Sequence, residues 1–449
     1  MTLNRRQIMT GAAGLGAGLA ASAGPRTALA QESDVKTGIL SVASFGVQPG
    51  IKNDQTKAFQ QAIDAAAQRS AVLHIPGGEY ITGKLILKSN TIITGVPGIS
   101  ILKLQGDDAS LVAKSAKNIH LLGLVLDGGS SIQYKSALIS ADDVDGLRIR
   151  DCKISAGTAN GISLNTCSGL ISDNEISAIK LTGLFCNNST GLDISHNHIH
   201  NCGNNAIQIW RSSQGEDGTI VTHNRIDAIR AEAGGSGQNG NGINVFRANS
   251  VQITGNRITN CEFTAIRGNA ASNIQIIGNS CARLGEVAIY AEFGFEGALI
   301  ANNLIDRAAT GISVTNFNEG GRMAVIQGNM VRNMFLRNGK RGTGIGVEAD
   351  AIVSGNVIEG APGVGIQIGW GKFLRDVNAT GNLIREAHVG IGISVVPDAG
   401  YAFVTNNMIT KTAEGGIRAM DHDKLLGPDL AKSSSESYRN IAVFGNVSQ

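Results

Sequence analysis

A short phrase built around an asparagine recurs through most of the chain. It consists of alternating apolar and polar residues, a small residue, Asn, any residue and then Ile or a relative, as in LDISHNHI, VQITGNRI and AIVSGNVI. Most successive copies are 22 to 27 residues apart. Self-similarity at a period of this size predicts a solenoid in which each repeat packs on its neighbours. The repeated residues are Asn174, Asn197, Asn224, Asn256, Asn279, Asn303, Asn329, Asn356, Asn382, Asn407 and Asn446, with Cys152 in the same slot one repeat earlier.

Each repeat contains short runs in which alternate residues are apolar. One run ends at the asparagine, and a second follows a turn, as in NGINVF, VAIYAE and VGIQIG. A period of two residues is typical of a β-strand with one face in a core. About 25 residues hold two or three such strands with their turns, the content of one coil of a parallel β-helix. A leucine-rich repeat would show leucine at fixed positions and a helical segment, and the chain shows neither.

The repeated asparagine has a structural explanation. Coils of a β-helix stack roughly 4.8 Å apart, so identical side-chain amides can bond to one another along the axis. We also expect the asparagine itself to take the left-handed backbone conformation of a tight corner. Insertions at 231–241 and 421–439 lengthen two steps, and we place them at turns. Residues 441–447 are predicted to form a final strand or cap.

The region from residue 42 to 104 lacks the asparagine phrase. Apolar residues in 55–68 recur at helical spacing, and Asp54 precedes them as a candidate N-cap. An open coil would expose its core and its strand edges, so we expect this helix to cover the first coil. Short β-rich runs follow at 72–75, 80–81, 84–87 and 91–93.

The motifs of this region carry a family resemblance. Phe45-Gly46-Val47, Asn53-Asp54-Gln55-Thr56 and Ile75-Pro76-Gly77-Gly78-Glu79-Tyr80 resemble the opening of pectate-lyase-like right-handed parallel β-helix proteins, which include polygalacturonase-type hydrolases and phage tailspike-like depolymerases. The usual acidic pair before the Thr is Asp54-Gln55 here. The resemblance implies an all-β, single-stranded right-handed parallel β-helix with an N-terminal capping helix. We assign 31–104 to the cap and first coils and 105–449 to the repeats.

Residues 1–30 resemble an export signal. Arg5 and Arg6 precede a weakly apolar Gly/Ala-rich run, Arg26 follows it, and 28–30 form a cleavage site of small residues. The pattern resembles a twin-arginine signal, which implies passage through the twin-arginine translocase to the periplasm or the exterior of a bacterium. An ordinary secretory leader with a chance arginine pair is the alternative. The leader, cap and repeats together also resemble bacterial twin-arginine-translocated repetitive proteins whose role is uncharacterised.

Composition excludes several classes of function. A formal net charge of +2 without a basic cluster gives no case for a nucleic-acid partner. Beyond the leader no run of 18 or more strongly apolar residues occurs, so we expect no transmembrane segment in the mature chain. We expect no cofactor. Six cysteines form no CxxC pair and are interpreted as buried structural residues without disulfides: Cys152, Cys167, Cys186, Cys202, Cys261 and Cys281.

The spacing of the histidines does not predict a metal site either. His196, His198 and His200 alternate and could present two imidazoles together, but no carboxylate partner is fixed beside them. We therefore expect no bound metal.

The outward residues of the second strand are the candidate functional face. Sugar rings stack on aromatic side chains, and planar amides and guanidinium groups bond hydroxyls and carboxylates. A plain solvated surface is the alternative explanation of these residues. One outward column holds Gln208, Asn244, Arg267, Tyr290, Ser313, Gly346 and Gln367, and the next holds Trp210, Phe246, Asn269, Glu292, Thr315, Glu348 and Gly369. We predict that a polysaccharide or cell-envelope glycan binds there through Trp210, Arg211, Asn244, Phe246, Arg247 and Asn269.

Two catalytic chemistries remain open on this face. Glu292 and Glu348 would lie two coils apart, about 10 Å, slightly beyond the roughly 6.5–9.5 Å of the carboxyl pair in inverting glycoside hydrolases. Alternatively, Arg267 would neutralise a uronate carboxylate while Tyr290 or a nearby base moves the proton in β-elimination or C5-epimerisation. Either chemistry requires the loops at 231–241, 293–297, 316–322 and 370–376 to wall a cleft around Arg267 and Glu292.

No family motif selects between these chemistries. The Asn-Thr-Asp, Gly-His-Gly and Arg-Ile-Lys motifs of polygalacturonases are absent. Asp421-His422-Asp423-Lys424 distantly resembles the Asp-Pro-His-Glu cluster of β-helix alginate epimerases, but it lacks the Pro and the Glu and is expected to form a polar turn. We predict an exported protein that binds a polysaccharide, with cleavage or epimerisation as a lyase, glycoside hydrolase or uronate epimerase left open. The alternative is a non-catalytic periplasmic envelope protein that binds glycan or acts as a scaffold.

Overall fold

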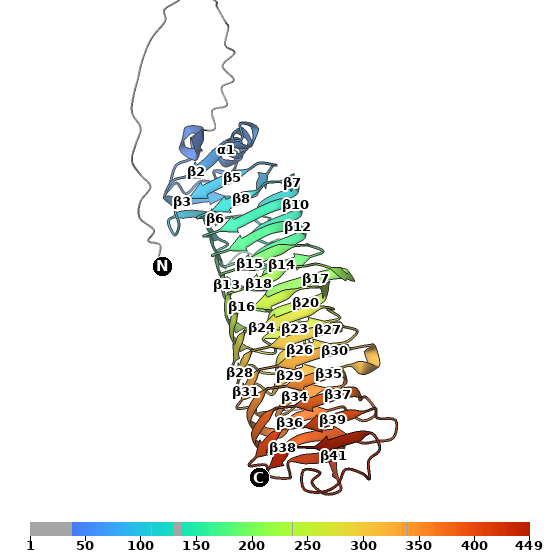
Figure 1. Cartoon of the computed structure of the whole chain (residues 1–449). Helices are drawn as coiled ribbons and strands as arrows, with labels where there is room; N and C mark the ends of the chain where they lie inside the picture. The colour runs from blue at the N-terminus through green and yellow to red at the C-terminus, as the bar shows by residue number, and fades with distance from the viewer. Residues whose placement is uncertain (1–37, 109, 130–136, 236, 338–339) are drawn as a thin grey trace, which may run out of the picture. The chain divides into compact units, whose positions relative to one another are not determined.

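The computed structural model describes residues 38–449, apart from 109, 130–136, 236 and 338–339. The predicted leader, residues 1–30, lies outside the described residues. The described chain forms a right-handed parallel β-helix of about 13 turns with a single short α-helix near its N-terminal end, which confirms the predicted fold class (Figure 1). Within these residues, no helix is long and apolar enough to cross a membrane.

The coils contribute strands to three faces, and the strands of each face pair in parallel from coil to coil. Face 1 contains the strands that end at the asparagine corner, together with the C-terminal parts of β10 (Ile139–Arg150) and β12 (Ile162–Ser172). Its other strands are β1 (Ile39–Ser41), β2 (Val72–Ile75), β5 (Ile92–Gly95), β8 (His120–Leu122), β15 (Leu192–Ser195), β18 (Ile220–Thr222), β21 (Gln252–Thr254), β24 (Ile274–Ile277), β27 (Glu296–Ala301), β30 (Arg322–Gln327), β35 (Ala349–Ser354), β37 (Arg375–Thr380), β39 (Ala402–Thr405) and β43 (Ile441–Phe444).

Face 2 contains the strands that follow the corner, together with the N-terminal parts of β36 (Val357–Ile368) and β38 (Leu383–Ser394). Its other strands are β3 (Gly78–Thr82), β6 (Ser100–Leu104), β9 (Val125–Asp127), β11 (Lys153–Ser155), β13 (Glu175–Ile179), β16 (His198–Cys202), β19 (Arg225–Ile229), β22 (Arg257–Cys261), β25 (Ser280–Ala282), β28 (Leu304–Asp306), β31 (Met330–Arg332), β40 (Met408–Thr410) and β44 (Val447–Ser448).

Face 3 is the second strand of the sequence repeat, and it includes the N-terminal parts of β10 and β12 and the C-terminal parts of β36 and β38. Its other strands are β4 (Leu85–Leu87), β7 (Leu111–Lys117), β14 (Thr182–Asn187), β17 (Asn205–Glu216), β20 (Asn241–Asn249), β23 (Ile266–Asn269), β26 (Val287–Glu292), β29 (Thr310–Val314), β34 (Thr343–Val347) and β41 (Ile417–Asp421). The turns leading into and out of this face carry the insertions that position the candidate site.

The core is filled by inward side chains stacked from coil to coil. Ile253, Ile276 and Ile300 occupy successive rungs of face 1, and each is fully buried. The six cysteines are buried and free, as predicted. Burial raises the pKa of the Cys281 thiol to about 12, so this side chain behaves as a small apolar residue rather than a nucleophile.

The predicted ladder of asparagine amides is confirmed. The backbone N–H of Asn279 donates to Oδ1 of Asn303 at 2.9 Å, and Nδ2 of Asn279 donates to the same oxygen at 3.0 Å. Nδ2 of Asn279 also donates to the carbonyl of Ile253 at 2.9 Å, which ties the corner to face 1. The same donor and acceptor pattern connects the rungs from Asn174 to Asn446.

The backbone conformation expected for these asparagines is wrong. The left-handed residue is the one before each ladder asparagine, for example Asp173 (φ 60°), His196 (φ 56°) and Gly278 (φ 68°), and no ladder asparagine has a positive φ. The preceding residue turns the chain from face 1 into face 2, and the asparagine side chain points inward and meets the next coil. Left-handed backbone favours Gly, Asn, Asp and His, which explains the small or polar residue that precedes the asparagine in the repeat.

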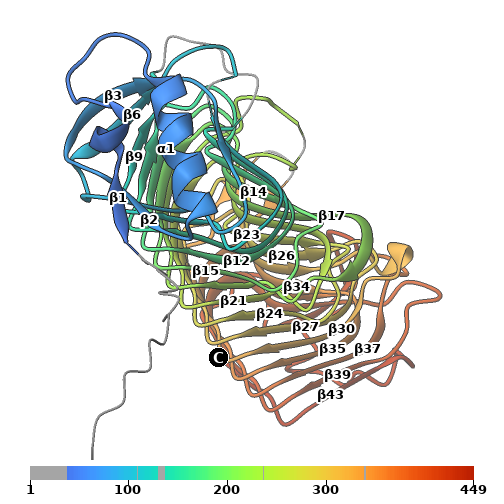
Figure 2. The same cartoon turned by 90° about the horizontal axis from the view of Figure 1, so that it is seen from above.

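The predicted N-terminal cap is confirmed. Helix α1 (Thr56–Gln68) lies across the first coils, with the 3-10 turn η1 (Val42–Phe45) beside it (Figure 2). Its buried face includes Phe59, whose ring packs edge-on against Tyr80 with centroids 5.6 Å apart. The N-cap position falls on Gln55 rather than Asp54, but Oδ1 of Asp54 still accepts the N–H of Thr56 at 3.0 Å.

The late insertion closes face 3 at the other end of the solenoid. The expected polar turn at 421–424 joins β41 to β42 (Lys424–Leu426) in an antiparallel hairpin. The segment after it packs Leu430 into the core. The Asp429 carboxylate accepts the N–H groups of Gly416 and Ile417 at 2.8 and 2.9 Å, in place of the carbonyls of a further coil. The predicted last strand at 441–447 corresponds to β43 and β44.

Candidate functional site

The outward columns predicted on face 3 are aligned in the structure. Cα pairing places Gln208, Asn244, Arg267, Tyr290, Ser313, Gly346 and Gln367 on successive rungs. Trp210, Phe246, Asn269 and Glu292 form the second column. Ala291 pairs with Val314, which pairs with Val347. Glu292 and Glu348 follow the first and last of these, so they lie two rungs apart, about 10 Å by ladder spacing.

The N-terminal part of this surface holds a hollow of about 420 Å³, called here the aromatic hollow. The ring centroids of Trp210 and Phe246 lie 5.6 Å apart on its floor. Nδ2 of Asn244 donates to the carbonyl of Gln238 at 3.0 Å, which holds the 231–241 insertion against face 3. The insertion therefore forms one wall. The lining residues are Trp210, Gly237, Gln238, Asn244, Phe246, Arg267, Asn269 and Phe293.

The C-terminal part holds a second hollow of about 290 Å³, called here the carboxyl hollow. Its floor on face 3 includes Tyr290, Ser313, Thr315, Thr343, Glu348 and Gln367, and loops add Asn316, Arg341 and Trp370. The guanidinium carbon of Arg341 lies 3.9 Å from the Trp370 ring centroid, and Nε of Arg341 lies 2.5 Å from Oδ1 of Asp423. Trp370 also meets His422 edge-on, with centroids 4.8 Å apart. Three segments distant in sequence therefore build this wall.

Arg267 and Tyr290 separate the two hollows. Arg267 lines the aromatic hollow and Tyr290 the carboxyl hollow, with the guanidinium carbon 5.3 Å from the tyrosine ring centroid. Nε and Nη2 of Arg267 each lie 2.5 Å from Oε1 of Glu292, to which Asn269 also donates at 3.1 Å. Burial raises the pKa of Glu292, and Arg267 and Asn269 oppose that rise. Glu292 lines neither hollow and is only 2% exposed.

Glu348 and Tyr290 are titratable groups that face the carboxyl hollow. Oε2 of Glu348 accepts the N–H of Phe317, in the 3-10 turn η2 (Phe317–Glu319), at 2.8 Å. Burial raises the pKa of Glu348, and the N–H groups of Phe317 and Asn316 oppose that rise. Burial also raises the pKa of Tyr290 to about 12. At neutral pH the phenol is therefore a proton carrier, and the carboxyl keeps its proton to a higher pH than an exposed glutamate does.

The four loops named from the sequence all reach this surface. Gly237 and Gln238 come from 231–241, Phe293 from 293–297, Asn316 from 316–322 and Trp370 from 370–376. They wall two hollows on either side of Arg267 and Glu292 rather than one cleft around them, so the arrangement that both predicted chemistries required at Arg267 and Glu292 is not present.

Two of the predicted binding residues lie outside both hollows. Nη1 of Arg211 donates to the carbonyl of Ser189 at 3.3 Å. The guanidinium of Arg247 lies 4.7 Å from the Phe246 ring centroid, and its Nη1 donates to the carbonyl of Ser212 at 2.9 Å. Both arginines follow the last outward column, where the chain turns toward face 1, so they hold the neighbouring turns together.

Several lining residues are not predicted by the sequence pattern. Trp370 could have been predicted, because it is one of two tryptophans and directly follows the second-strand phrase VGIQIG. Arg341 could not have been predicted, since it lies in a hairpin of β32 (Leu336–Arg337) and β33 (Lys340–Arg341) that occurs in one coil. Gln238 and Phe293 likewise belong to loops with no counterpart in the other repeats.

The histidines pair without building a metal site. The rings of His198 and His200 lie 4.4 Å apart, and His196 stacks on His223 at 5.3 Å. Nε2 of His200 lies 3.7 Å from Oε1 of Glu175. In the described part of the chain, no group of three or more His, Cys, Asp or Glu side chains could hold a metal ion.

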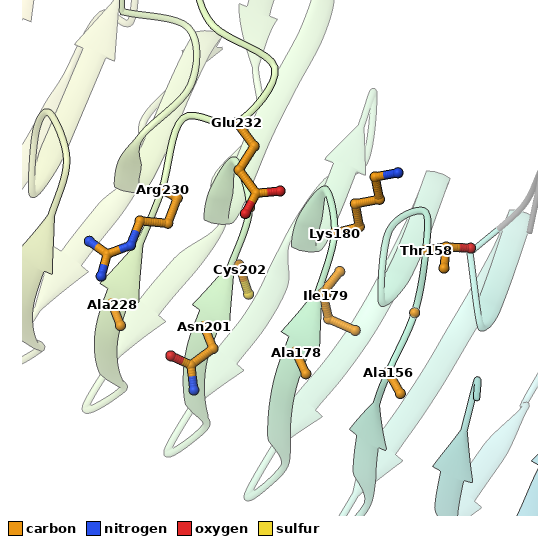
Figure 3. A pocket seen from close by; sticks show the side chains of 12 residues that line it. Ala156, Thr158, Ala178, Ile179, Lys180, Asn201, Cys202, Ala228, Arg230 and Glu232 are labelled. Carbon is orange, nitrogen blue, oxygen red and sulfur yellow. The ribbon is translucent and has the colours of Figure 1, made fainter. Parts of the chain in front are cut away.

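A further hollow of about 450 Å³ lies away from the outward columns, where face 2 turns into face 3 (Figure 3). Alanines and glycines line much of it, and Lys180, Arg230 and Glu232 stand at its rim. Figure 3 shows Lys180 and Arg230 pointing in opposite directions. The two basic side chains at the rim therefore do not converge on one ligand position.

Family profiles match two overlapping parts of the chain. Residues 39–267, just over half of the chain, match the family described as rhamnogalacturonase A/epimerase, pectate lyase-like. Residues 205–384 match the right handed beta helix region. A search of curated proteins found no match.

Several solved structures share the fold at low sequence identity. The N-terminal fragment of gene product 12 of bacteriophage phi29 superposes with a TM-score of 0.58 and 14% identity, over 91% of this chain and 70% of that one. The pre-mature form of that protein superposes with a TM-score of 0.54 and 16% identity, over 85% of this chain and 55% of that one. The catalytic unit of a GH87 alpha-1,3-glucanase from Streptomyces thermodiastaticus superposes with a TM-score of 0.49 and 16% identity, over 92% of this chain and 69% of that one. The two superpositions on the phage protein establish the fold alone.

Proposed function

The chain belongs to the rhamnogalacturonase A/epimerase, pectate lyase-like family, and we propose on that premise that face 3 binds a polysaccharide across the aromatic and carboxyl hollows. The observation that carries the proposal is the alignment of two hollows on one strand face, both lined by aromatic rings and planar polar side chains. Such groups stack on sugar rings and bond their hydroxyls. Concave sites of this kind are where ligands bind.

A second candidate function is cleavage of the bound chain in the carboxyl hollow. Glu348 lines that hollow with its pKa raised by burial, which suits a general acid. The glycosidic bond would break as its oxygen takes the Glu348 proton, and water would add its hydroxyl to the sugar carbon and return its remaining proton to the Glu348 carboxylate. Tyr290 is protonated at neutral pH, so it would donate a hydrogen bond. This favours hydrolysis over an elimination or epimerisation with Tyr290 as base.

Glu292 takes a different role in this proposal. Its buried carboxylate is held by Arg267 and Asn269, so it would position Arg267 rather than act on substrate. The paired-carboxylate hypothesis with Glu348 therefore has less support than a single acid at Glu348.

Binding is tested with the full mature chain and a panel of uronic-acid and neutral polysaccharides. Trp210→Ala and Trp370→Ala should each weaken binding about tenfold, the worth of one aromatic stacking contact. Phe403→Ala is the matched control, because this aromatic is 51% exposed but lies on face 1. A wild type that binds no glycan would overturn the proposal, as would a control that loses as much affinity as the two tryptophan variants.

Cleavage is tested separately with Glu348→Gln. Turnover should fall by at least about a hundredfold while the polysaccharide still binds. Binding by the wild type without any turnover would instead support the non-catalytic glycan-binding or scaffold protein.

We further propose export through the twin-arginine translocase, on the sequence of residues 1–30 alone. Arg5→Lys combined with Arg6→Lys should retain the precursor in the cytoplasm of an expressing bacterium, as measured by cell fractionation. Continued export of this variant would favour the ordinary secretory route.

A further inference from the structure

We infer that the ligand is an extended oligosaccharide long enough to occupy both hollows at once, and that the aromatic hollow is an anchor remote from the chemistry. The inference rests on the proposed function, and it adds a minimum chain length and a division of roles between the two hollows.

The spacing of the hollows sets the length. The aromatic hollow is centred on β20, which carries Asn244 and Phe246, and the carboxyl hollow on β29 and β34, which carry Ser313 and Gly346. Three rungs separate β20 from β29, and four separate it from β34. At about 4.8 Å per rung the centres lie roughly 15–20 Å apart. A single sugar ring cannot reach both hollows, whereas an extended chain of several rings can.

The hollows adjoin across Arg267 and Tyr290, so one chain that crosses this pair would reach both. Arg267 borders one and Tyr290 the other, and these two side chains pack on each other. They lie on adjacent rungs of the same outward column. A ligand that follows this column along the solenoid axis would therefore lie over Arg267 and Tyr290 between the two hollows.

The chemistry of the two hollows differs. The cation of the aromatic hollow, Arg267, is already paired with Glu292, and its other lining groups are aromatic rings, amides and backbone. Nε1 of Trp210 and Nη1 of Arg267 are buried and find no hydrogen-bond partner among the residues that the structure describes. Unpaired buried donors cost free energy until an oxygen bonds them. Trp210 and Arg267 both line the aromatic hollow, so we take it as the place where a sugar oxygen would bond these donors, while Glu348 places the acid chemistry in the other hollow.

Linking two sites through one ligand makes the second contact intramolecular, which raises affinity by about 10² or more. We therefore expect a step in affinity, rather than a gradual rise, at the first ligand length that bridges both hollows. A ligand too short to bridge should bind with the affinity of one hollow alone.

The experiment measures Kd by calorimetry for oligogalacturonides of increasing length, from the disaccharide upward, and for a parallel gluco-oligosaccharide series. All titrations use the Glu348→Gln background, so that ligands stay intact. The step should reach at least about a hundredfold. Adding Trp210→Ala should remove the step and leave the affinity for short ligands unchanged. Adding Phe293→Ala tests the same point at a side chain that is 40% exposed, where folding is not at risk.

The outcomes separate the inference from the function beneath it. A smooth rise without a step overturns the inference while leaving polysaccharide binding in place. Equal losses for short and long ligands in the Trp210→Ala and Phe293→Ala variants overturn it as well. Failure of every oligosaccharide in both series, and of the polysaccharides themselves, to bind the wild type overturns the proposed function and the inference together.

Discussion

Two glycines of the 231–241 insertion provide a test at the scale of single residues. Gly237 has a φ of 136°, and a Cβ there would lie 1.7 Å from Nη1 of Arg267. Gly234 has a φ of 70°, but a Cβ there would meet nothing within 4 Å. Alanine costs backbone strain of about 1–2 kcal/mol at Gly234, and more at Gly237, whose φ lies outside the left-handed region open to other residues. Only Gly237→Ala should also displace the guanidinium and weaken glycan binding, by at least about tenfold.

The matched pair is measured by glycan titration and by thermal unfolding. Gly234→Ala should retain full affinity with a smaller loss of stability. Equal affinities in the two variants would show that the wall formed by the insertion does not shape the aromatic hollow.

Glu348 predicts a pH-dependent stability. Burial raises its pKa in the folded chain, so ionisation costs more in the folded than in the unfolded state. The stability associated with the protonated carboxyl is fully present below the unfolded pKa and is lost as the pH rises through the folded pKa. Glu348→Gln cannot ionise, so its Tm should exceed that of the wild type at neutral pH. The two should converge below pH 4.5, the ordinary value for this group.

The exposed Glu319 in the adjacent turn is the control for this effect. Glu319→Gln should show no pH-dependent gap in Tm. A Glu348→Gln variant that is less stable than the wild type throughout the pH range would contradict a buried, proton-retaining carboxyl.

The sequence predicted those residues of the site that belong to the repeated strands, but not those that belong to the loops. The outward columns follow from the two-residue period, so the period alone places Asn244, Phe246 and Glu348. It does not reveal the role of Glu292, because the capture of that carboxylate by Arg267 depends on side-chain conformations that the period does not determine. The loop residue Arg341 could not be placed either, since the path of its hairpin is set by packing against Trp370 and Asp423.

Strand β41 provides a test at the scale of one element. Its first amides are satisfied by the Asp429 carboxylate rather than by a further coil. Asp429→Ala should leave two N–H groups unpaired, at roughly 1–3 kcal/mol each, and open this end of face 3. Hydrogen exchange at Gly416 and Ile417 should accelerate. Asp423→Ala, an exposed ion-pair partner of Arg341, should leave that exchange unchanged.

The Asp429 carboxylate predicts a pH dependence of stability that is opposite in direction to that of Glu348. Burial raises the pKa of Asp429, but the N–H groups of Ile417, Gly416 and Ala431 outweigh it and lower the pKa overall. Its stabilisation is therefore present above the unfolded pKa and is lost as the pH falls through the folded one. Protection of β41 that persists unchanged in strong acid would argue against this cap.

Helices and strands with a periodic pattern of apolar residues could be predicted from the sequence, whereas elements that occur only once could not. Helix α1 and the strands have periodic patterns that report their buried faces directly, so the predicted positions of α1 and of the strands in the first coils agree with the structure to within a residue or two. Some strands of the repeat, such as β17 and β36, extend several residues beyond the predicted run. The repeat also locates the corner, but the left-handed conformation lies one residue earlier than expected, because a sequence does not distinguish the residue that turns from the residue that bonds. The hairpins β32–β33 and β41–β42 occur once each and have no period to detect.

At the scale of the whole molecule, the ladder makes each coil depend on its neighbours. Every interior asparagine both donates to the next coil and accepts from the previous one, so the corner is one continuous network. The insertions that build the two hollows lie at turns and leave this network intact. The frame and the candidate site can therefore change independently, which is how a single repeat architecture can carry an irregular binding surface.

The ladder predicts that position along the solenoid decides the cost of one substitution. Asn279→Ala should leave the Asn256 N–H and the Ile253 carbonyl unpaired in the core, at roughly 3–5 kcal/mol in total. Asn446 is only partly buried and bonds Asn407 from one side, so water can replace it at about 1 kcal/mol or less. Chemical denaturation should rank the variants in this order. Similar losses for both would mean that the corner is held by core packing and that its amides contribute little.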